Sequence, residues 1–309
     1  MKKISIIGAG RVGEATAQVI ASRNLAREIV LMDINEGVAK GSALDIQETA
    51  PLFCFDTRVV GSTKAEDLQD SNLVIITAGI PRRPGMSRSD VLETNVKIIN
   101  GIVDNILQYA PDCMILIVSN PVDILTYHIW KRTGWDRSRI FGQAGVLDSA
   151  RMAAFVALET GLSVRNINAM VLGGHGDAMV PMIRFTTIAG IPIKNFLSKE
   201  IIDSIVERSR FGGAEILALK QNSSAYDAPA AAIAEMVEAI VLDRHQILPT
   251  VAILEGEYGQ ESLAMGVPCI LSDKGIEEIV CLQLNAEEQS MFDTTIDLLK
   301  QGVKKLPSS

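Results

Sequence analysis

Cysteine is scarce in this chain, and the spacing of its four copies suggests neither cross-links nor metal binding. Cys54, Cys113, Cys269 and Cys281 are far apart and form no CxxC pair. Each has apolar neighbours in the sequence, so we expect four buried free thiols in a reducing compartment. The sequence also lacks an HExxH motif, a Cys/His cluster and an EF-hand loop, so we expect no metal.

Long apolar runs and an excess of basic residues are missing as well. No run reaches the roughly 18 residues that span a bilayer, and no leader-like segment precedes the first predicted strand, so we expect a cytoplasmic protein with no membrane partner. The net charge of −8 argues against nucleic acid as a partner. The 309 residues, 48% hydrophobic and 21% charged, are typical of a globular protein with one large domain or two.

A short apolar strand, residues 2–7, leads directly into the glycine-rich turn Gly8-Ala9-Gly10-Arg11-Val12-Gly13. We expect Gly8 to allow the tight turn, Gly10 to let the backbone approach a phosphate, and Gly13 to let the next helix pack against the strand. A helix predicted over residues 12–22 would point its N-terminal N–H groups at the same phosphate. An isolated GxGxxG motif also occurs in strand–helix turns that bind nothing, so its context decides the interpretation.

The context here is that of a dinucleotide site. A second apolar strand, residues 28–32, ends in Asp33, twenty residues after Gly13. A Rossmann unit places at this distance the carboxylate that binds the adenosine ribose hydroxyls. The same carboxylate would repel a 2′-phosphate, so we predict NAD rather than NADP as the cofactor.

The rest of the chain alternates between strands and helices. Because the first predicted strands are apolar on both faces, they suit a parallel sheet covered by helices. We therefore predict an α/β protein with a doubly wound parallel-sheet Rossmann domain, residues 1–145, followed by a mixed α+β substrate domain, residues 146–309. The predicted strands cover residues 58–61, 73–77, 113–119, 168–173, 250–255 and 267–272, with short alternating strands in 182–193. The predicted helices cover residues 36–49, 91–109, 147–160, 197–210, 212–220, 229–241 and 286–306, and residues 80–90 form a predicted loop.

One of the three histidines has a suggestive setting. His175 follows a predicted strand, among the small residues of Gly173-Gly174-His175-Gly176-Asp177, where backbone and ligand can come close. Histidine exchanges protons near neutral pH, and oxidation of an alcohol beside a nicotinamide requires a base for the hydroxyl proton. His175 is the predicted base, oriented by a carboxylate that spacing alone does not identify. His128 and His245 lie in helical or helix-end patterns and are assigned to packing or solvent.

Arginines are the candidate binders of an anionic substrate. Arg82, Arg83 and Arg88 crowd the loop after a predicted strand, over the sheet edge where α/β proteins bind ligands. They could pair with a substrate carboxylate through the guanidinium fork, or they could be solvated loop charges. Arg151 lies three residues after Asp148 on one face of a predicted helix, and this spacing by itself fits a local surface ion pair.

Several motifs in this order make the chain resemble the lactate/malate dehydrogenase family from end to end. They are Gly8-Ala9-Gly10-Arg11-Val12-Gly13, Asp33, Thr77-Ala78-Gly79 with the loop to Asn95, Val118-Ser119-Asn120-Pro121-Val122-Asp123, Gly145-Val146-Leu147-Asp148-Ser149-Ala150-Arg151 and Gly173-Gly174-His175-Gly176-Asp177. The resemblance implies reversible hydride transfer between (S)-malate and NAD, giving oxaloacetate and NADH, as in the tricarboxylic acid cycle. The implied partner is therefore a small dicarboxylate, with NAD as the cofactor.

The resemblance also implies roles for single residues. His175 matches the family's proton donor and acceptor, and Asp148 matches its partner carboxylate. Arg151 matches the arginine that holds the C1 carboxylate of the substrate. Arg88 matches the arginine that polarises the reacting carbonyl when the loop closes.

Four further positions carry implied binding roles. Arg82 falls where lactate dehydrogenases have Gln and malate dehydrogenases have Arg, so it would pair with the second carboxylate of oxaloacetate. Asn120, followed by a cis peptide bond to Pro121, would hold substrate and cofactor together. Asn95 and Ser119 match cofactor-binding positions.

Two alternatives stay open. A lactate or other 2-hydroxyacid dehydrogenase would share these features but differ at position 82. A non-catalytic NAD-binding sensor could use the fold without turnover, although it would not need His175, Asp148 and the arginines together. The resemblance further implies a homodimer or homotetramer, with the helices at 36–49 and 229–241 as possible interface faces.

Overall fold

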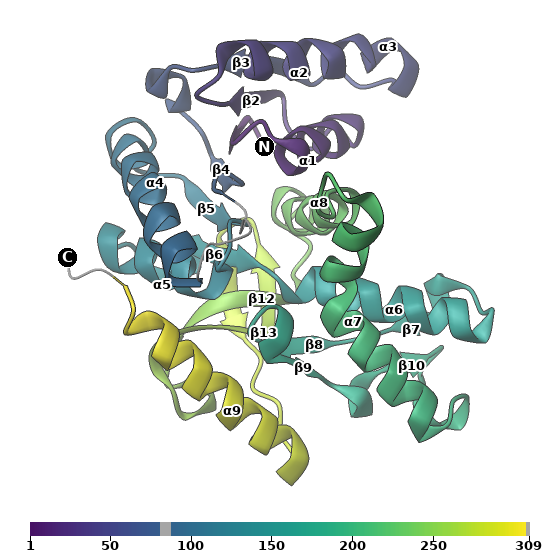
Figure 1. Ribbon diagram of the computed structural model, residues 1–309. Helices are drawn as coiled ribbons and strands as arrows, with labels where there is room; N and C mark the ends of the chain where they lie inside the picture. Colours follow the sequence, from purple (N-terminus) through teal and green to yellow (C-terminus); the bar gives the residue numbers. More distant parts are fainter. Residues whose placement is uncertain (81–87, 307–309) are drawn as a thin grey trace.

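The computed structural model describes residues 1–80 and 88–306, with side chains described at all of these positions except 88 and 89. Its centre is one large mixed sheet with helices packed around it (Figure 1). A second, three-stranded sheet lies in the C-terminal part of the described chain.

The N-terminal half of the large sheet is parallel. Its strands follow the order β3-β2-β1-β4-β5-β6. The chain thus adds β2 and β3 on one side of β1 and then β4, β5 and β6 on the other, so the strand order reverses between β1 and β4. Such a reversal leaves a crevice at the carboxyl ends of the strands, where α/β proteins bind ligands. The strands are β1 (Lys3–Ile7), β2 (Glu28–Met32), β3 (Arg58–Ser62), β4 (Leu73–Ile76), β5 (Met114–Ile117) and β6 (Ile140–Gln143).

Helices connect these parallel strands, and all of those named here except the short, exposed α3 bury an apolar face. They are α1 (Arg11–Ser22), α2 (Glu36–Glu48), α3 (Ala50–Phe53), α4 (Arg88–Tyr109) and α5 (Val122–Thr133). Helix α2 begins at a capping residue, Asn35, whose side chain accepts a hydrogen bond from the Val38 N–H group. All residues of β4 and β5 are buried, as expected for strands covered on both faces.

The sheet continues past β6 with antiparallel strands. β12 pairs with β6 and β13, β13 also pairs with β8 and β14, and β8 pairs with β9. These strands are β8 (Val171–Gly173), β9 (Met179–Pro181), β12 (Gln246–Glu255), β13 (Glu261–Ser272) and β14 (Gly275–Ile279), and the small sheet consists of β7 (Ile167–Asn168), β10 (Thr187–Ile188) and β11 (Ile191–Pro192). The predicted fold class, a parallel Rossmann sheet followed by mixed α and β structure, is confirmed.

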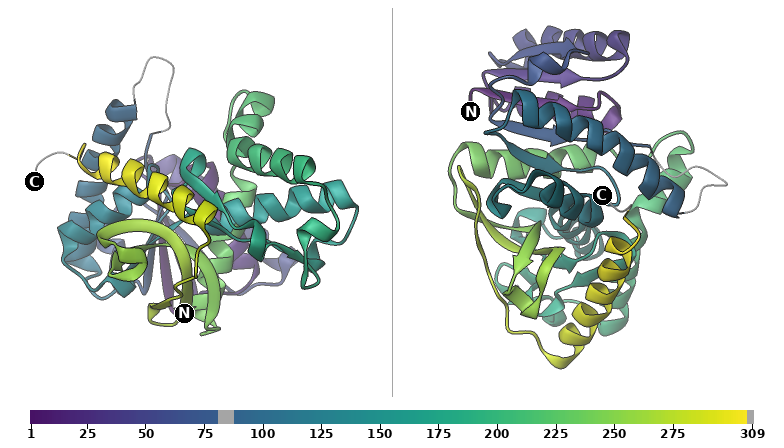
Figure 2. Two further views of the ribbon diagram at one scale, coloured as in Figure 1. Left: turned by 90° about the horizontal axis from the view of Figure 1, so that it is seen from below. Right: turned by 90° about the vertical axis from the view of Figure 1, so that its left-hand side faces the viewer.

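Four long helices complete the C-terminal half. They are α6 (Gly145–Thr160), α7 (Lys199–Lys220), α8 (Asp227–Val241) and α9 (Ala286–Val303). Helix α8 packs against α1 of the parallel half, while α9 packs on α5, β9 and β13 (Figures 1 and 2). One buried apolar cluster runs through both halves, and a second cluster joins α6 and α7 to the small sheet.

Among the described helices and strands, the sequence pattern misses five, α3, α5, β6, β9 and β14. Helix α5 buries most of its first turn, and a Cβ on Gly142 of β6 would lie 2.7 Å from Thr126 Oγ1 and 2.8 Å from Val122 Cγ2. Because this helix and strand are packed on several sides, neither shows the one-sided apolar period on which the prediction depends.

Three predicted segments, one strand and two helices, are divided differently in the structure. The strand predicted over residues 168–173 is two strands, since β7 pairs with β10 in the small sheet and β8 pairs with β9 and β13 in the large one. The helices predicted over 197–210 and 212–220 are one helix, α7, which continues through Gly212 and Gly213. Glycine lowers helix propensity, but tertiary packing overrides that preference here.

The burial predicted for the cysteines is right for Cys113 and Cys269 and wrong for Cys54 and Cys281, which are exposed; all four are free thiols. Cys54 ends the short helix α3 in a left-handed conformation at the surface. Apolar neighbours in the sequence therefore did not decide burial at these positions. Among the described residues, no helix combines the length and apolarity needed to cross a membrane.

Candidate active site

The glycine-rich turn lies where β1 meets α1. Gly8 has a φ of +107°, a conformation that L side chains rarely adopt. A Cβ on Gly13 would lie 1.9 Å from the Gly8 carbonyl oxygen, so a side chain there would push the helix off the strand. Gly10 has open space where its Cβ would lie, which leaves the main chain accessible to a ligand. The three glycines thus have the geometries that the motif predicts.

Asp33 lies at the end of β2 beside this turn. Its Oδ2 atom accepts a hydrogen bond from the Ala9 N–H group at 2.9 Å, and its Oδ1 atom accepts one from Asn35 at 3.0 Å. The carboxylate is therefore held against the glycine-rich turn. A ribose with free 2′- and 3′-hydroxyls can donate to these oxygens, whereas a 2′-phosphate would be repelled.

A cavity of about 610 Å³ extends from the turn along the sheet edge. Gly8, Gly10 and Asp33 line it, and α4 contributes an apolar wall in which Gly101 leaves room between Ile98 and Ile102. This wall was not predicted from the sequence, although the i, i+3, i+4 spacing of its residues marks one helix face. An open glycine-rich turn, a carboxylate held against it and an apolar wall fit a dinucleotide such as NAD.

Asn95, Ser119 and Asn120 lie together after β4 and β5 but do not line this cavity as described. The Asn95 amide donates to the Asn120 carbonyl at 2.7 Å and accepts from the Ile80 N–H group at 2.8 Å. The Ser119 hydroxyl donates to the Ala78 carbonyl at 2.6 Å. Two of these side chains thus tie the loops after neighbouring strands together, while Asn120 is exposed and precedes a cis peptide bond to Pro121, as the resemblance implies.

His175 and Arg151 both contact the carboxylate of Asp148. Nδ1 of His175 lies 3.0 Å from Oδ2 of Asp148, and Nη1 of Arg151 lies 3.3 Å from Oδ1 of the same carboxylate. Asp148 and Arg151 both come from α6, and Asp148 is 2% exposed. The surface ion pair considered from spacing alone therefore joins a buried carboxylate to a half-buried arginine, and the carboxylate also contacts the histidine.

The surroundings of His175 favour its protonated form. Burial alone would lower the pKa of His175, but the negative charge of Asp148 and the hydrogen bond between them, with a further contribution from Asp123, raise that pKa above its ordinary value. The hydrogen bond to Asp148 assigns the Nδ1 proton, so Nε2 is the atom left to exchange a proton with a ligand.

Arg151 retains unused binding capacity. Its Nε atom is buried and has no hydrogen-bond partner among the described residues, and burial lowers the pKa of its guanidinium against the opposing effect of Asp148. A buried donor without an acceptor is costly, and a ligand carboxylate would satisfy it.

Helix α7 leaves space for the Arg151 side chain. This packing was not predicted from the sequence. A Cβ on Gly212 would lie 3.3 Å from Cδ of Arg151, and one on Gly213 would lie 3.7 Å from its Nη2 atom. Gly212 and Gly213 could have indicated this packing, because glycines inside a helical sequence pattern often lie where another group packs closely against the helix.

Arg82 and Arg83 lie outside the described residues. Arg88 is the first residue of α4, and its side chain also lies outside what is described. His128 and His245 do not join the site: Nε2 of His128 lies 2.7 Å from Asn100 Oδ1, and Nδ1 of His245 lies 2.9 Å from Glu277 Oε2.

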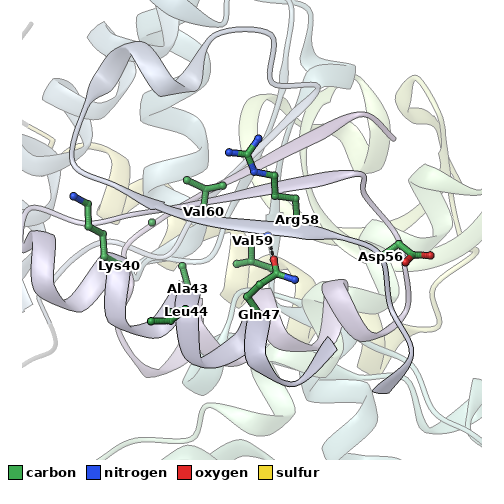
Figure 3. Close-up of a pocket in the computed structure, with 9 residues that line it drawn as sticks. Lys40, Ala43, Leu44, Gln47, Asp56, Arg58, Val59 and Val60 are labelled. Atoms are coloured by element: carbon green, nitrogen blue, oxygen red, sulfur yellow. Dashed lines mark hydrogen bonds between the residues drawn. The ribbon is translucent and has the colours of Figure 1, made fainter. Parts of the chain in front are cut away.

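Another cavity, of about 590 Å³, lies at the outer edge of the sheet, between α2 and β3 (Figure 3). Figure 3 shows Gln47 reaching from the helix to the strand, where its Oε1 atom accepts a hydrogen bond from the Val59 N–H group at 2.7 Å. The described residues that line this cavity include no histidine or cysteine. Within residues 1–80 and 88–306, no group of three or more acidic, histidine or cysteine side chains could hold a metal ion.

A glycine-rich turn at the switch point of a parallel sheet, together with a His–Asp pair in the same chain, is typical of the class of dinucleotide-dependent oxidoreductases. Residues 2–142 match the family of lactate/malate dehydrogenase, NAD binding domain, and residues 145–308 match lactate/malate dehydrogenase, alpha/beta C-terminal domain. The chain belongs to the lactate/malate dehydrogenase family.

Full-length relatives support the same assignment. The chain is 65% identical over 306 residues to a malate dehydrogenase of Thioalkalivibrio sulfidiphilus, covering 99% of this chain and 100% of that protein. It is 60% identical over 306 residues to one from Nitrosococcus oceani, covering 99% and 98%. The apo structure of malate dehydrogenase from Picrophilus torridus has a TM-score of 0.95 at 41% identity, covering 98% of this chain and 96% of that one.

Proposed function

We propose that this chain catalyses the reversible oxidation of (S)-malate to oxaloacetate with NAD as the hydride acceptor. The observation that carries the proposal is the placement of one buried carboxylate, Asp148, against both a histidine and a partly unpaired arginine. The relatives that are 65% and 60% identical are malate dehydrogenases, which favours this substrate over lactate.

Arg151 is the proposed site for the C1 carboxylate of the substrate. Its buried Nε atom has no hydrogen-bond partner in the part of the chain that the structure describes, and its Nη1 atom is held by Asp148, so the guanidinium fork has a fixed orientation. A carboxylate bound there would place the C2 hydroxyl group near the imidazole of His175.

His175 is the proposed base. With its Nδ1 proton donated to Asp148, the ring accepts the malate hydroxyl proton at Nε2, and Asp148 stabilises the imidazolium that forms. NAD, when bound, supplies the acceptor for the C2 hydride. In the reverse direction, protonated His175 returns its proton to the developing alkoxide of oxaloacetate.

Cofactor binding is proposed for Gly8, Gly10, Gly13 and Asp33, with Asn95, Ser119 and Asn120 at the nicotinamide end. Asn120 would also contact the substrate. Arg82 and Arg88 keep the roles that the family resemblance implies: Arg82 pairs with the second carboxylate, and Arg88 polarises the reacting carbonyl.

We also propose that residues 1–145 form the cofactor-binding domain and residues 146–309 the substrate-binding domain. The unpaired thiols are consistent with a cytoplasmic location, since structural disulfides are rare in that compartment.

A homodimer or homotetramer is the proposed assembly. Leu44, Leu52 and Phe53 on α2 and α3 are 60%, 81% and 58% exposed, and such an apolar surface suits a contact with a second copy. Helix α8 buries most of its apolar residues against its own chain, so it offers less surface. Analytical ultracentrifugation tests the assembly, and a monomer at micromolar concentration would contradict it.

The decisive experiment is NADH oxidation with oxaloacetate and with pyruvate, at equal enzyme concentration. We expect oxaloacetate to react faster by orders of magnitude. Preference for pyruvate would instead identify a lactate or other 2-hydroxyacid dehydrogenase. NADH binding without turnover of either acid would indicate a non-catalytic sensor.

A further inference from the structure

Asp123 is a buried acid whose placement the proposed mechanism leaves unexplained. It is the second residue of α5, directly beyond the cis peptide bond at Pro121, and it is 6% exposed. Burying a carboxylate costs free energy unless hydrogen bonds or charges compensate. Its contacts should therefore show what it does.

This carboxylate contacts the main chain of His175, in a distant part of the chain. Oδ2 of Asp123 accepts a hydrogen bond from the His175 N–H group at 3.2 Å, while Oδ1 is buried and has no hydrogen-bond partner among the described residues. The bond joins two segments 52 residues apart in the sequence. Asp123 thus fixes the backbone of the residue whose ring Asp148 fixes from α6.

Asp123 also acts on the ring through its charge. The charged groups that bear on His175 are Asp123 from α5, and Asp148 and Arg151 from α6. The two carboxylates favour the protonated imidazole and Arg151 opposes it. Burial raises the pKa of Asp123 to about 6, despite the His175 N–H bond that lowers it, so the carboxylate is charged in neutral solution.

We propose that Asp123 is a positioning residue for the reaction, which holds the main chain of His175 by a hydrogen bond and stabilises its protonated ring as a second carboxylate. This inference rests on the proposed function of His175 as the proton-exchanging group. It goes beyond that function because it assigns to α5, next to the Asn120-Pro121 turn, control over when the histidine is protonated.

The two parts of the role can be separated by substitution. Asp123→Asn keeps an oxygen that can accept from the His175 N–H group but removes the charge, whereas Asp123→Leu removes both. We expect Asp123→Asn to shift the pH dependence of kcat/KM to lower pH, because the protonated imidazole loses a stabilising charge. Asp123→Leu should lose more activity, on the order of 10²-fold in kcat/KM, because the histidine is also released.

Asp136→Asn is the matched control. Asp136 also accepts a main-chain hydrogen bond through a carboxylate oxygen, from Ser138 at 2.9 Å, but it lies beside the short helix at Arg137–Arg139 and outside the groups that act on His175. This variant should leave the pH profile unchanged. An equal shift in both variants would refute a specific role for Asp123.

A direct titration provides a second readout. The chain has three histidines, so the His175 ring can be followed by NMR in full-length protein and assigned by its loss in His175→Asn. We expect its titration midpoint to lie above the ordinary histidine value in the wild type and to fall in Asp123→Asn. A wild-type midpoint at or below the ordinary value overturns the proposal, even if the Asp123 variants do not fold.

The outcomes also distinguish this proposal from the proposed function. If Asp123→Asn and Asp123→Leu lower only the melting temperature, with kcat/KM and its pH profile unchanged, Asp123 is merely structural and the reaction assignment stands. If the wild-type enzyme oxidises NADH with neither oxaloacetate nor pyruvate, the proposed function fails, and the positioning role fails with it.

Discussion

Gly212 of α7 lies against the side chain of Arg151, at a distance where an added Cβ would be 3.3 Å from Cδ of the arginine. The helix therefore carries a glycine at the point where it packs against Arg151, the arginine proposed to bind the substrate. Gly212 has no side chain, yet this contact lets it influence the position of Arg151 in the proposed site.

Gly212→Ala should displace Arg151 by a few tenths of an ångström. We expect KM for oxaloacetate to rise several-fold, because a displaced Arg151 would bind the substrate carboxylate less well. The value of kcat should change less, because the flexible arginine side chain can adjust to the added methyl group. Steady-state kinetics checks this. Gly41→Ala in α2, where nothing lies within 4 Å of the new Cβ, is the control and should leave KM unchanged. If both variants have the same KM for oxaloacetate, the contact of Gly212 with Arg151 does not affect substrate binding.

His175→Asn removes the proposed base but keeps a polar side chain. We expect kcat to fall by about 10²–10⁴-fold, the usual contribution of a positioned acid–base group. The cofactor cavity does not include this residue, so the dissociation constant of NADH, measured by fluorescence titration, should change little. Turnover within tenfold of the wild type would remove His175 from the mechanism.

Arg82→Gln tests substrate choice. The variant should lose most of its oxaloacetate turnover and gain pyruvate reduction, because the second carboxylate loses its partner while a methyl group no longer faces an unpaired charge. The measurement is the ratio of kcat/KM for the two acids. An unchanged ratio would contradict the role proposed for Arg82.

The surroundings of the second and third glycines of the turn predict different effects for two alanine variants. Gly13→Ala puts a Cβ 1.9 Å from the Gly8 oxygen, and this overpacking should lower the free energy of unfolding by about 1–3 kcal/mol. Gly10→Ala meets no atom within 4 Å, so stability should change little while NADH affinity falls. Chemical denaturation and NADH titration check both expectations. Equal stability of the two variants would contradict the close packing at Gly13.

Glu257 should contribute to stability in a pH-dependent way. Arg137 binds it through two hydrogen bonds, at 2.8 and 3.0 Å, and these lower its pKa from 4.5 to about 2. Because the folded pKa is the lower one, the contribution is present above about pH 4.5 and is lost as pH falls towards 2. Glu257→Gln should therefore lower the free energy of unfolding by about 1–3 kcal/mol at pH 7.

Denaturation from pH 7 to pH 3 measures that effect, and the difference from the wild type should shrink below about pH 4.5. Glu215→Gln is the control, since Glu215 makes a similar pair with Arg208 at an exposed position, where ion pairs contribute little. A Glu257 effect that does not depend on pH would rule out the ion pair as its source.

The parallel half of the fold was predictable because its strands and glycines act locally. β2 spans Glu28–Met32, as the apolar run predicts, and the turn geometry at Gly8 follows from its sequence context. Elements buried on several sides, such as β6, could not be predicted in this way because their residues show no one-sided period.

The site was predictable only in part. The setting of His175 suggested a base, but its pairing with Asp148 depends on the contact between two segments 27 residues apart, which only the resemblance had implied. The bond from Asp123 to the His175 main chain, and the glycines of α7 beside Arg151, depend on tertiary packing that no spacing rule contains.

The hydrogen bond from the Val59 N–H group to Gln47 affects how readily one molecule can pair with another through the edge of its sheet. Strand β3 is the outermost strand of the parallel half, and an edge strand with free N–H groups can recruit a strand from another molecule. Here the Gln47 side chain of the same molecule already accepts a hydrogen bond from one of those N–H groups. Sheet extension from one molecule to the next, the first step towards fibrils, is thereby disfavoured at this edge.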